Sequence, residues 1–89
     1  MNKERRKQID VVIEAINDLQ NRFEELQQAI EEIRDEEQEY LDNIPENLQS
    51  SERYELAEDA VNNLESAVNW FDNVDVEELT SLLEEAKGI

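Results

Sequence analysis

Apolar residues recur along the first half of the chain in alternating steps of three and four residues. The series is Ile9, Val12, Ile16, Leu19, Phe23, Leu26, Ile30, Ile33, Tyr40 and Ile44. This is the seven-residue repeat of a helix with one apolar face, and only Glu37 interrupts it. Because neither proline nor glycine occurs before Pro45, the pattern predicts one helix over residues 3–42.

A turn and a second helix are expected next. Pro45 disfavours helical geometry at Ile44, which predicts a turn over residues 43–50, and Ser50 or Ser51 can cap a helix over 51–73. The apolar seam of that helix is Tyr54, Ala57, Val61, Leu64, Val68 and Phe71, with a second stripe at Leu56, Ala60, Ala67, Trp70 and Val74. Two apolar sides indicate a helix packed between neighbours.

A short third helix is predicted over residues 76–87. Asp75 and Glu78 have the spacing of a capping box, and Gly88 follows as a stop signal. The apolar face of this helix is Val76, Leu79, Leu82, Leu83 and Ala86. The pattern therefore predicts an all-α fold in one domain, 1–89, with a long coiled-coil-like helix, a helical hairpin and a short C-terminal helix.

The length of the first helix favours dimerisation. At a rise of 1.5 Å per residue it would be about 60 Å long, and we expect the rest of the chain to cover only part of its seam. A second copy would then cover the free part, as a homodimer, in parallel or antiparallel sense. The predicted dimer seam is Ile9, Val12, Ile16, Leu19, Phe23 and Leu26.

Composition adds an acidic surface to this picture. The chain has 25 acidic and 8 basic residues and a net charge of −17, and four of the bases lie within the first seven residues. Ten of the twelve acids between Asp10 and Asp42 face away from the seam when Ile9 is counted as position a. The candidate partner-binding set on this face is Glu24, Glu25, Glu31, Glu32, Asp35, Glu39 and Asp42.

Such a surface repels nucleic acid and anionic lipid, so we expect a basic protein as partner. Neighbours one turn apart such as Glu31 and Asp35 carry like charges that a merely soluble helix would alternate with lysine. One carboxylate per roughly 4 Å of helix is close to the roughly 3.4 Å between phosphates of a DNA strand. A nucleic-acid mimic is thus physically possible, while a plain solvated face explains the same residues. Halophilic adaptation would also produce this surface.

Two residues of the apolar pattern have alternative interpretations. Glu37 occupies a seam position and is either solvated near the turn, where it could pair with Arg34 or Arg53, or sets the register of pairing. Trp70 is either a core residue beside Phe71 or a binding hot spot.

The basic cluster at the start is either a loose phosphate-binding arm or a frayed helix end.

The sequence offers no catalytic or cofactor site. The chain has no histidine or cysteine, which excludes thiolate metal sites and the Glu-x-x-His motif of di-iron bundles. Glu36 and Glu39 match half of the magnesium motif of helical nucleotide pyrophosphatases, but the second half and the phosphate-binding cations are missing. Residues 72–75 lack the glycine of a calcium loop. We therefore expect no enzyme activity, metal or cofactor.

The segment from Glu36 to Tyr54, which contains Asn-Ile-Pro-Glu-Asn-Leu at residues 43–48 and leads into the alanine-rich second helix, resembles small acidic proteins of phages and prophage-like elements. The resemblance covers about residues 36–68 and carries no assigned chemistry. It implies a context in which short acidic proteins inhibit host nucleases by occupying their nucleic-acid channels.

The leading hypothesis is a non-catalytic protein that binds a basic surface of a partner, with a nucleic-acid mimic that inhibits a defence nuclease as its specific form. The alternative is a homo-oligomeric structural or assembly module whose coiled coil is the function. No run approaches 18 apolar residues and no signal core follows the start, so we expect a cytoplasmic protein, in the host cell if phage-encoded.

Overall fold

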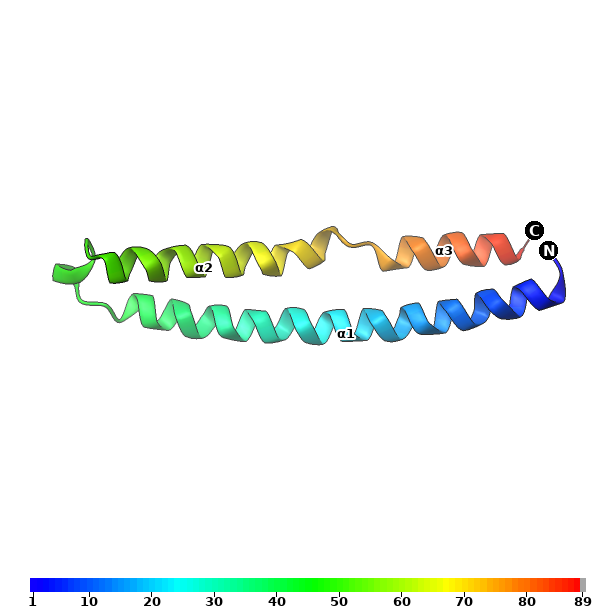
Figure 1. The fold of residues 1–89 in the computed structure, drawn as a ribbon, viewed down its shortest axis with the longest axis horizontal. Coiled ribbons are helices and arrows are strands. Elements are labelled where there is room, and N and C mark those ends of the chain that lie inside the picture. Colours follow the sequence, from blue (N-terminus) through cyan, green and yellow to red (C-terminus); the bar gives the residue numbers. More distant parts are fainter. Residues whose placement is uncertain (89) are drawn as a thin grey trace. The chain divides into compact units, whose positions relative to one another are not determined.

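Residues 1–88 are described by the computed structural model, and within them the chain is helical without a β-strand. The α-helices are α1 (Lys3–Asp42), α2 (Glu52–Trp70) and α3 (Val76–Lys87), and the 3₁₀ helices are η1 (Glu46–Leu48) and η2 (Phe71–Asn73) (Figure 1). The predicted all-α class, with a long first helix, a hairpin and a short last helix, is confirmed. Dimerisation stays a prediction.

Two compact units share α1. Unit 1 combines Met1–Glu25 with the segment that starts at Val74, and unit 2 is Leu26–Asn73. Unit 1 therefore holds the first part of α1 with α3, and unit 2 holds the last part of α1 with α2.

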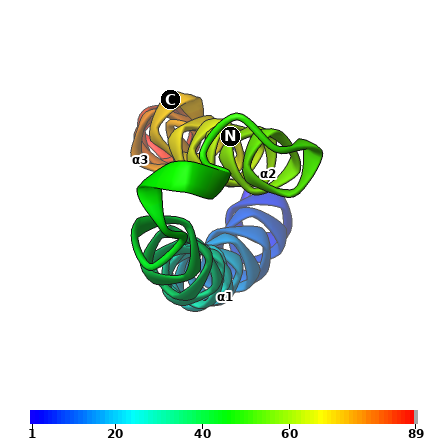
Figure 2. The same cartoon turned by 90° about the vertical axis from the view of Figure 1, so that its left-hand side faces the viewer.

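Unit 2 is an antiparallel helical hairpin, whose turn faces the viewer in Figure 2. Pro45 holds an extended backbone, with φ −58° and ψ 147°, and this ends the helical path after α1. Ser51 caps α2: its Oγ accepts a hydrogen bond from the Tyr54 backbone N–H at 3.3 Å and donates one to the Leu48 carbonyl at 2.6 Å. Of the two serines considered from the sequence, Ser51 is the cap.

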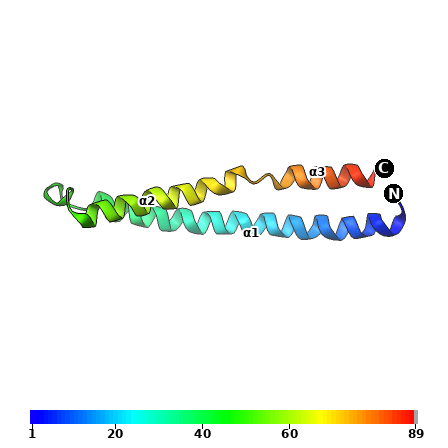
Figure 3. The ribbon, with the colours of Figure 1, turned by 45° about the horizontal axis from the view of Figure 1, so that its top comes forward.

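The core of unit 2 lies near this turn. Leu41 and Ile44 pack against Ala57 and Val61, with Tyr54 partly buried beside them. Each of the four core residues is between 4% and 8% exposed, and further along α2 Val68 is 5% exposed. Figure 3 shows α2, which carries Ala57, Val61 and Val68, lying along the second part of α1.

Unit 1 pairs α3 with the first part of α1. Its helices have local caps: Asn2 Oδ1 accepts from the Arg5 N–H at 2.8 Å, and Asp75 Oδ1 accepts from the Glu78 N–H at 2.9 Å. Its best-covered apolar side chains are only half-buried, and none falls in the buried core. They are Ile9, Ile13, Ile16, Phe23, Val74, Val76, Leu83 and Ala86.

The apolar seam expected on α1 is divided between two faces. Its a positions from Ile9 to Ile30 are half-buried, but its d positions are exposed: Val12 48%, Leu19 45%, Leu26 54%, Ile33 53% and Tyr40 38%. The e positions are covered instead, namely Ile13, Gln20, Gln27, Arg34 and Leu41. Within the chain, α3 packs along α1 in unit 1 and α2 packs along it in unit 2, and the d half of the seam stays exposed. That a second copy covers this half stays a prediction.

Candidate partner-binding surface

The acidic side chains expected to bind a partner all project from α1. Six of the seven are exposed, namely Glu24, Glu25, Glu32, Asp35, Glu39 and Asp42. Glu31 is half-buried, because it follows Gln27 by one turn on the side that approaches α2. An uninterrupted helix fixes their spacing, so these carboxylates form a surface of defined geometry.

Two of these carboxylates are engaged within the chain. Arg34 donates to Asp35 Oδ1 from Nε and Nη2, at 3.2 and 3.1 Å, and Gln38 donates to Asp42 Oδ1 at 2.8 Å. The ion pairs of residues 1–88 involve none of the other five, which are Glu24, Glu25, Glu31, Glu32 and Glu39. The negative charge of these five is therefore available to a partner.

A second acidic row lies on α2 and η2 and was not predicted from the sequence. Gln27 Nε2 donates to the Val68 carbonyl at 3.0 Å and to Asp72 Oδ1 at 3.2 Å, which brings Asp72 beside α1. Stepping back from Asp72 by seven residues gives Glu65 and then Glu58, and all three are exposed. Their heptad spacing was the available signal. Unit 2 thus has one face with acids from both helices.

The opposite side of the same hairpin is apolar at its surface. Tyr40 and Leu56 meet in an open groove of about 530 Å³, which Glu37, Glu52, Arg53 and Ala57 also line. The Arg53 guanidinium lies over the Tyr40 ring, 5.3 Å from its centroid, and Arg53 Nε donates to the Tyr40 hydroxyl. The groove therefore combines apolar side chains with one cation, held by Tyr40, and two acids.

Glu37 is half-buried in this groove. The pairing considered from the sequence is not formed: the ion pairs of residues 1–88 do not include Glu37, since Arg34 pairs with Asp35 and Arg53 contacts Tyr40. Its alternative role in setting register stays a hypothesis.

Trp70 and Phe71 contact each other at the end of α2. Their rings are 5.2 Å apart at 90°, an edge-to-face arrangement. Phe71 is half-buried, whereas Trp70 is 57% exposed. Trp70 is thus accessible for the hot-spot role, which remains untested.

The residues expected in a dimer seam are not all on one face. Ile9, Ile16 and Phe23 are half-buried, while Val12, Leu19 and Leu26 are exposed. Only the exposed half of that set is accessible to a second copy.

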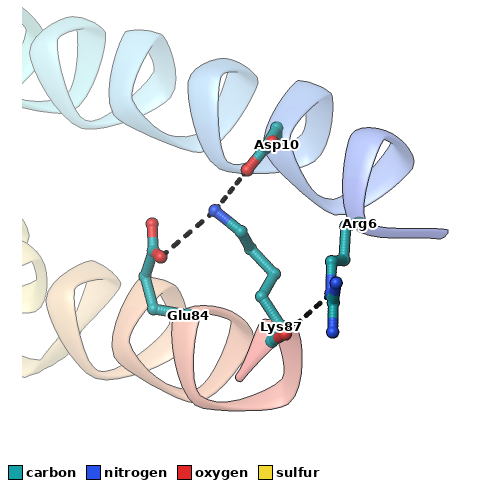
Figure 4. A network of polar contacts seen from close by, with 4 residues as sticks. All are labelled: Arg6, Asp10, Glu84 and Lys87. Carbon is teal, nitrogen blue, oxygen red and sulfur yellow. Dashed lines mark hydrogen bonds and ion pairs between the residues drawn. The ribbon is translucent and has the colours of Figure 1, made fainter. Parts of the chain in front are cut away.

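The basic start of the chain has a structural role in unit 1. Arg6 Nε donates to the Lys87 carbonyl at 3.1 Å, and Lys87 Nζ pairs with Asp10 and, at 3.3 Å, with Glu84 (Figure 4). The hydrogen bond to Asp10 raises the pKa of Lys87 above its ordinary value; partial desolvation opposes this, and Glu84 adds to it. Lys3, Arg5 and Lys7 remain exposed.

Within residues 1–88, no group of three or more acidic side chains is arranged to hold a metal ion. In the same range, no helix has the length and apolar character required to span a membrane. Protein-family models, curated proteins and solved structures, when compared with this chain, give no match.

Proposed function

We propose that this is a non-catalytic protein that acts by binding a basic surface of a partner protein through the acidic side chains of α1 and α2. The observation that carries the proposal is the set of five α1 carboxylates without a cation partner, from Glu24 to Glu39. The exposed row at Glu58, Glu65 and Asp72 adds charge to unit 2, which also holds Glu31, Glu32 and Glu39. Repulsion between like charges lowers the stability of the helix, and a basic partner that neutralises these charges would explain why they are present.

The specific form of this proposal is a nucleic-acid mimic. Carboxylates spaced roughly 4 Å apart along α1 approximate the spacing of phosphates on a strand, so a groove that binds DNA could accept the helix instead. The resemblance of residues 36–68 to small acidic phage proteins supports an inhibitor of a host defence nuclease, acting in the host cytoplasm.

The test is a charge-reversal variant, Glu24→Lys, Glu31→Lys and Asp35→Lys, assayed against a basic double-strand nuclease by surface plasmon resonance and DNA cleavage. We expect the native chain to bind and inhibit, with an association rate that falls roughly tenfold between low and physiological salt. The variant should lose inhibition. Its matched control is Glu14→Lys, Glu77→Lys and Glu85→Lys, which changes the charge equally at exposed positions outside the set. An association rate that ignores salt would contradict the proposal.

A second candidate function is homo-oligomeric assembly, in which pairing of copies is itself the role. The exposed apolar side chains at the d positions of α1 favour it. The same charge-reversal variant separates the two functions, because an assembly module would keep its oligomeric state when Glu24, Glu31 and Asp35 are reversed. Equilibrium sedimentation of variant and native chain makes that comparison.

A further inference from the structure

Unit 2 has an uncovered apolar face, opposite the acidic one, to which both of its helices contribute. From α1 come Leu26, Ile33 and Tyr40, which are 54%, 53% and 38% exposed. The contact between Tyr40 and Arg53 fixes the register of the two helices, and Leu56, 62% exposed, lines the same groove as Tyr40.

The seven-residue repeat extends this register along the hairpin. One heptad from Tyr40 and Arg53 brings Ile33 opposite Ala60, and a second brings Leu26 opposite Ala67. Trp70 continues the row that starts at Leu56, with two heptads between them. The apolar face, as we use the term below, consists of Leu26, Ile33, Tyr40, Leu56, Ala60, Ala67 and Trp70.

We propose that this apolar face is the self-association surface of the protein, occupied by the same face of a second copy in a four-helix arrangement. Unit 2 is a single layer of two helices, and a layer of this kind can bury only one side of each helix internally. No side chain of residues 1–88 is less than 2% exposed, so the hairpin alone lacks a fully enclosed core. A second hairpin would supply the missing layer.

The shape of the face fits a copy of itself. Its α1 row carries large side chains, Leu26, Ile33 and Tyr40, whereas the adjacent α2 row is small at Ala60 and Ala67. A two-fold axis can set the large row of one copy over the small row of the other, twice, in an isologous interface. An unrelated helix would have to match both rows independently.

The area is adequate for a specific pair. From the exposed fractions of its five large residues, the face offers on the order of 500–600 Å² per copy, so complete burial in a pair would cover about 1,000–1,200 Å², the lower end of specific interfaces. The interface predicted from this face differs from the seam expected on the first half of α1, and it does not depend on the proposed basic partner.

The rim of the apolar face gives self-association a diagnostic salt response. Exposed acids flank it on both helices, at Glu32, Glu36 and Glu39 of α1 and at Glu52 and Asp59 of α2, and they outnumber Arg53, the cation that contacts Tyr40. Two copies bring these like charges together, so added salt should strengthen the pairing. Binding of a basic protein should weaken under the same change. Failure of one proposal is therefore distinguishable from failure of the other.

The experiment is sedimentation velocity of the full chain at micromolar concentrations in low and high salt. We expect a monomer–dimer equilibrium that shifts toward dimer in high salt. The variant Ile33→Gln with Leu56→Gln should raise the dissociation constant at least tenfold. Its control, Leu79→Gln with Leu82→Gln, makes the same change at exposed α3 positions of unit 1 and should leave it unchanged. A native monomer under all conditions, or an equal effect of both variants, would overturn the proposal.

A second measurement does not depend on removing apolar side chains. The chain has no cysteine, so a single introduced one takes a spin label at a unique position. Asn63 lies between Leu56 and Trp70 in the middle of their row, on the side of α2 that the second copy would cover, whereas Asn62 points toward the acidic side. A nitroxide label on Asn63→Cys should give a shorter distance between copies, measured by electron paramagnetic resonance, than the same label on Asn62→Cys. Equal distances would count against the apolar face.

Discussion

The two units of the chain are held together by different interactions. Unit 2 has a small apolar core, in which Leu41, Ile44, Ala57 and Val61 are each less than a tenth exposed. Unit 1 has no buried residue among those described and instead joins its helices through Arg6, Asp10 and Lys87. Hydrophobic burial gains free energy in proportion to area, whereas exposed ion pairs add little. We infer that unit 2 carries most of the stability.

The difference in core burial follows from the length of the helix that packs against α1 in each unit. α2 has 19 residues and brings Ala57, Val61 and Val68 to its covered face. α3 has only 12 residues, and its three leucines are divided between covered and exposed positions. Leu83 is half-buried, whereas Leu79 and Leu82 are exposed. A short helix with a divided apolar face cannot enclose side chains, so polar contacts at its C-terminal end fix it to α1.

The largest effect is expected from the same substitution made in each unit. Leu41→Ala removes a buried side chain and should lower the free energy of unfolding by about 2–4 kcal/mol, because a cavity remains in the core. Leu83→Ala removes a half-buried one and should cost about 1 kcal/mol or less. Urea unfolding followed by circular dichroism measures both. Equal losses would break the comparison between the units.

The helices and their order follow from the sequence, but the covered face of α1 does not. A repeat of three and four residues marks positions a and d as apolar, whereas the chain covers a and e, where Gln20, Gln27 and Arg34 are polar. Long polar side chains can pack their stems against a neighbour and still reach a partner, as Gln27 does at Val68. A pattern that divides residues only into apolar and polar assigns such side chains to the exposed surface.

The candidate surface was predictable in part for a similar reason. The seven-residue repeat of α1 places the acids of positions b, c and f away from its seam. Six of the seven acids in the candidate partner-binding set are exposed, as this placement predicts. The contribution of α2 depends on how the hairpin aligns, which the Gln27 to Asp72 contact establishes and one-dimensional spacing cannot. The ion pair between Asp10 and Lys87 likewise depends on the tertiary fold.

A smaller effect, confined to unit 1, is expected from Asp10→Asn. This substitution removes the charge that pairs with Lys87, and exposed pairs of this kind contribute little to stability. Amide hydrogen exchange should show a few-fold loss of protection over α3 and no change at Val61 in unit 2. Asp18→Asn is the matched control, because Asp18 is exposed on the same helix outside the ion pairs of residues 1–88. Loss of protection in both units would mean that they unfold together.

The smallest effect is a pH dependence of the same contact. The pKa of Lys87 is raised above 10.5 in the folded chain, chiefly by its hydrogen bond to Asp10. A raised folded pKa means that the protonated lysine stabilises the folded state, fully below pH 10.5, and that this stabilisation is lost as the pH rises through the folded value.

Lys87→Met isolates this contribution, because every other titrating group is the same in both proteins. Thermal unfolding should give the native chain a slightly higher melting temperature than the variant at pH 9, and the difference should shrink toward zero at alkaline pH above the folded pKa. Since Lys87 lies in unit 1, the low-temperature edge of the transition, where α3 separates first, should show the change most clearly. A difference that persists unchanged at high pH would assign the effect to the packing of the lysine stem rather than to its charge.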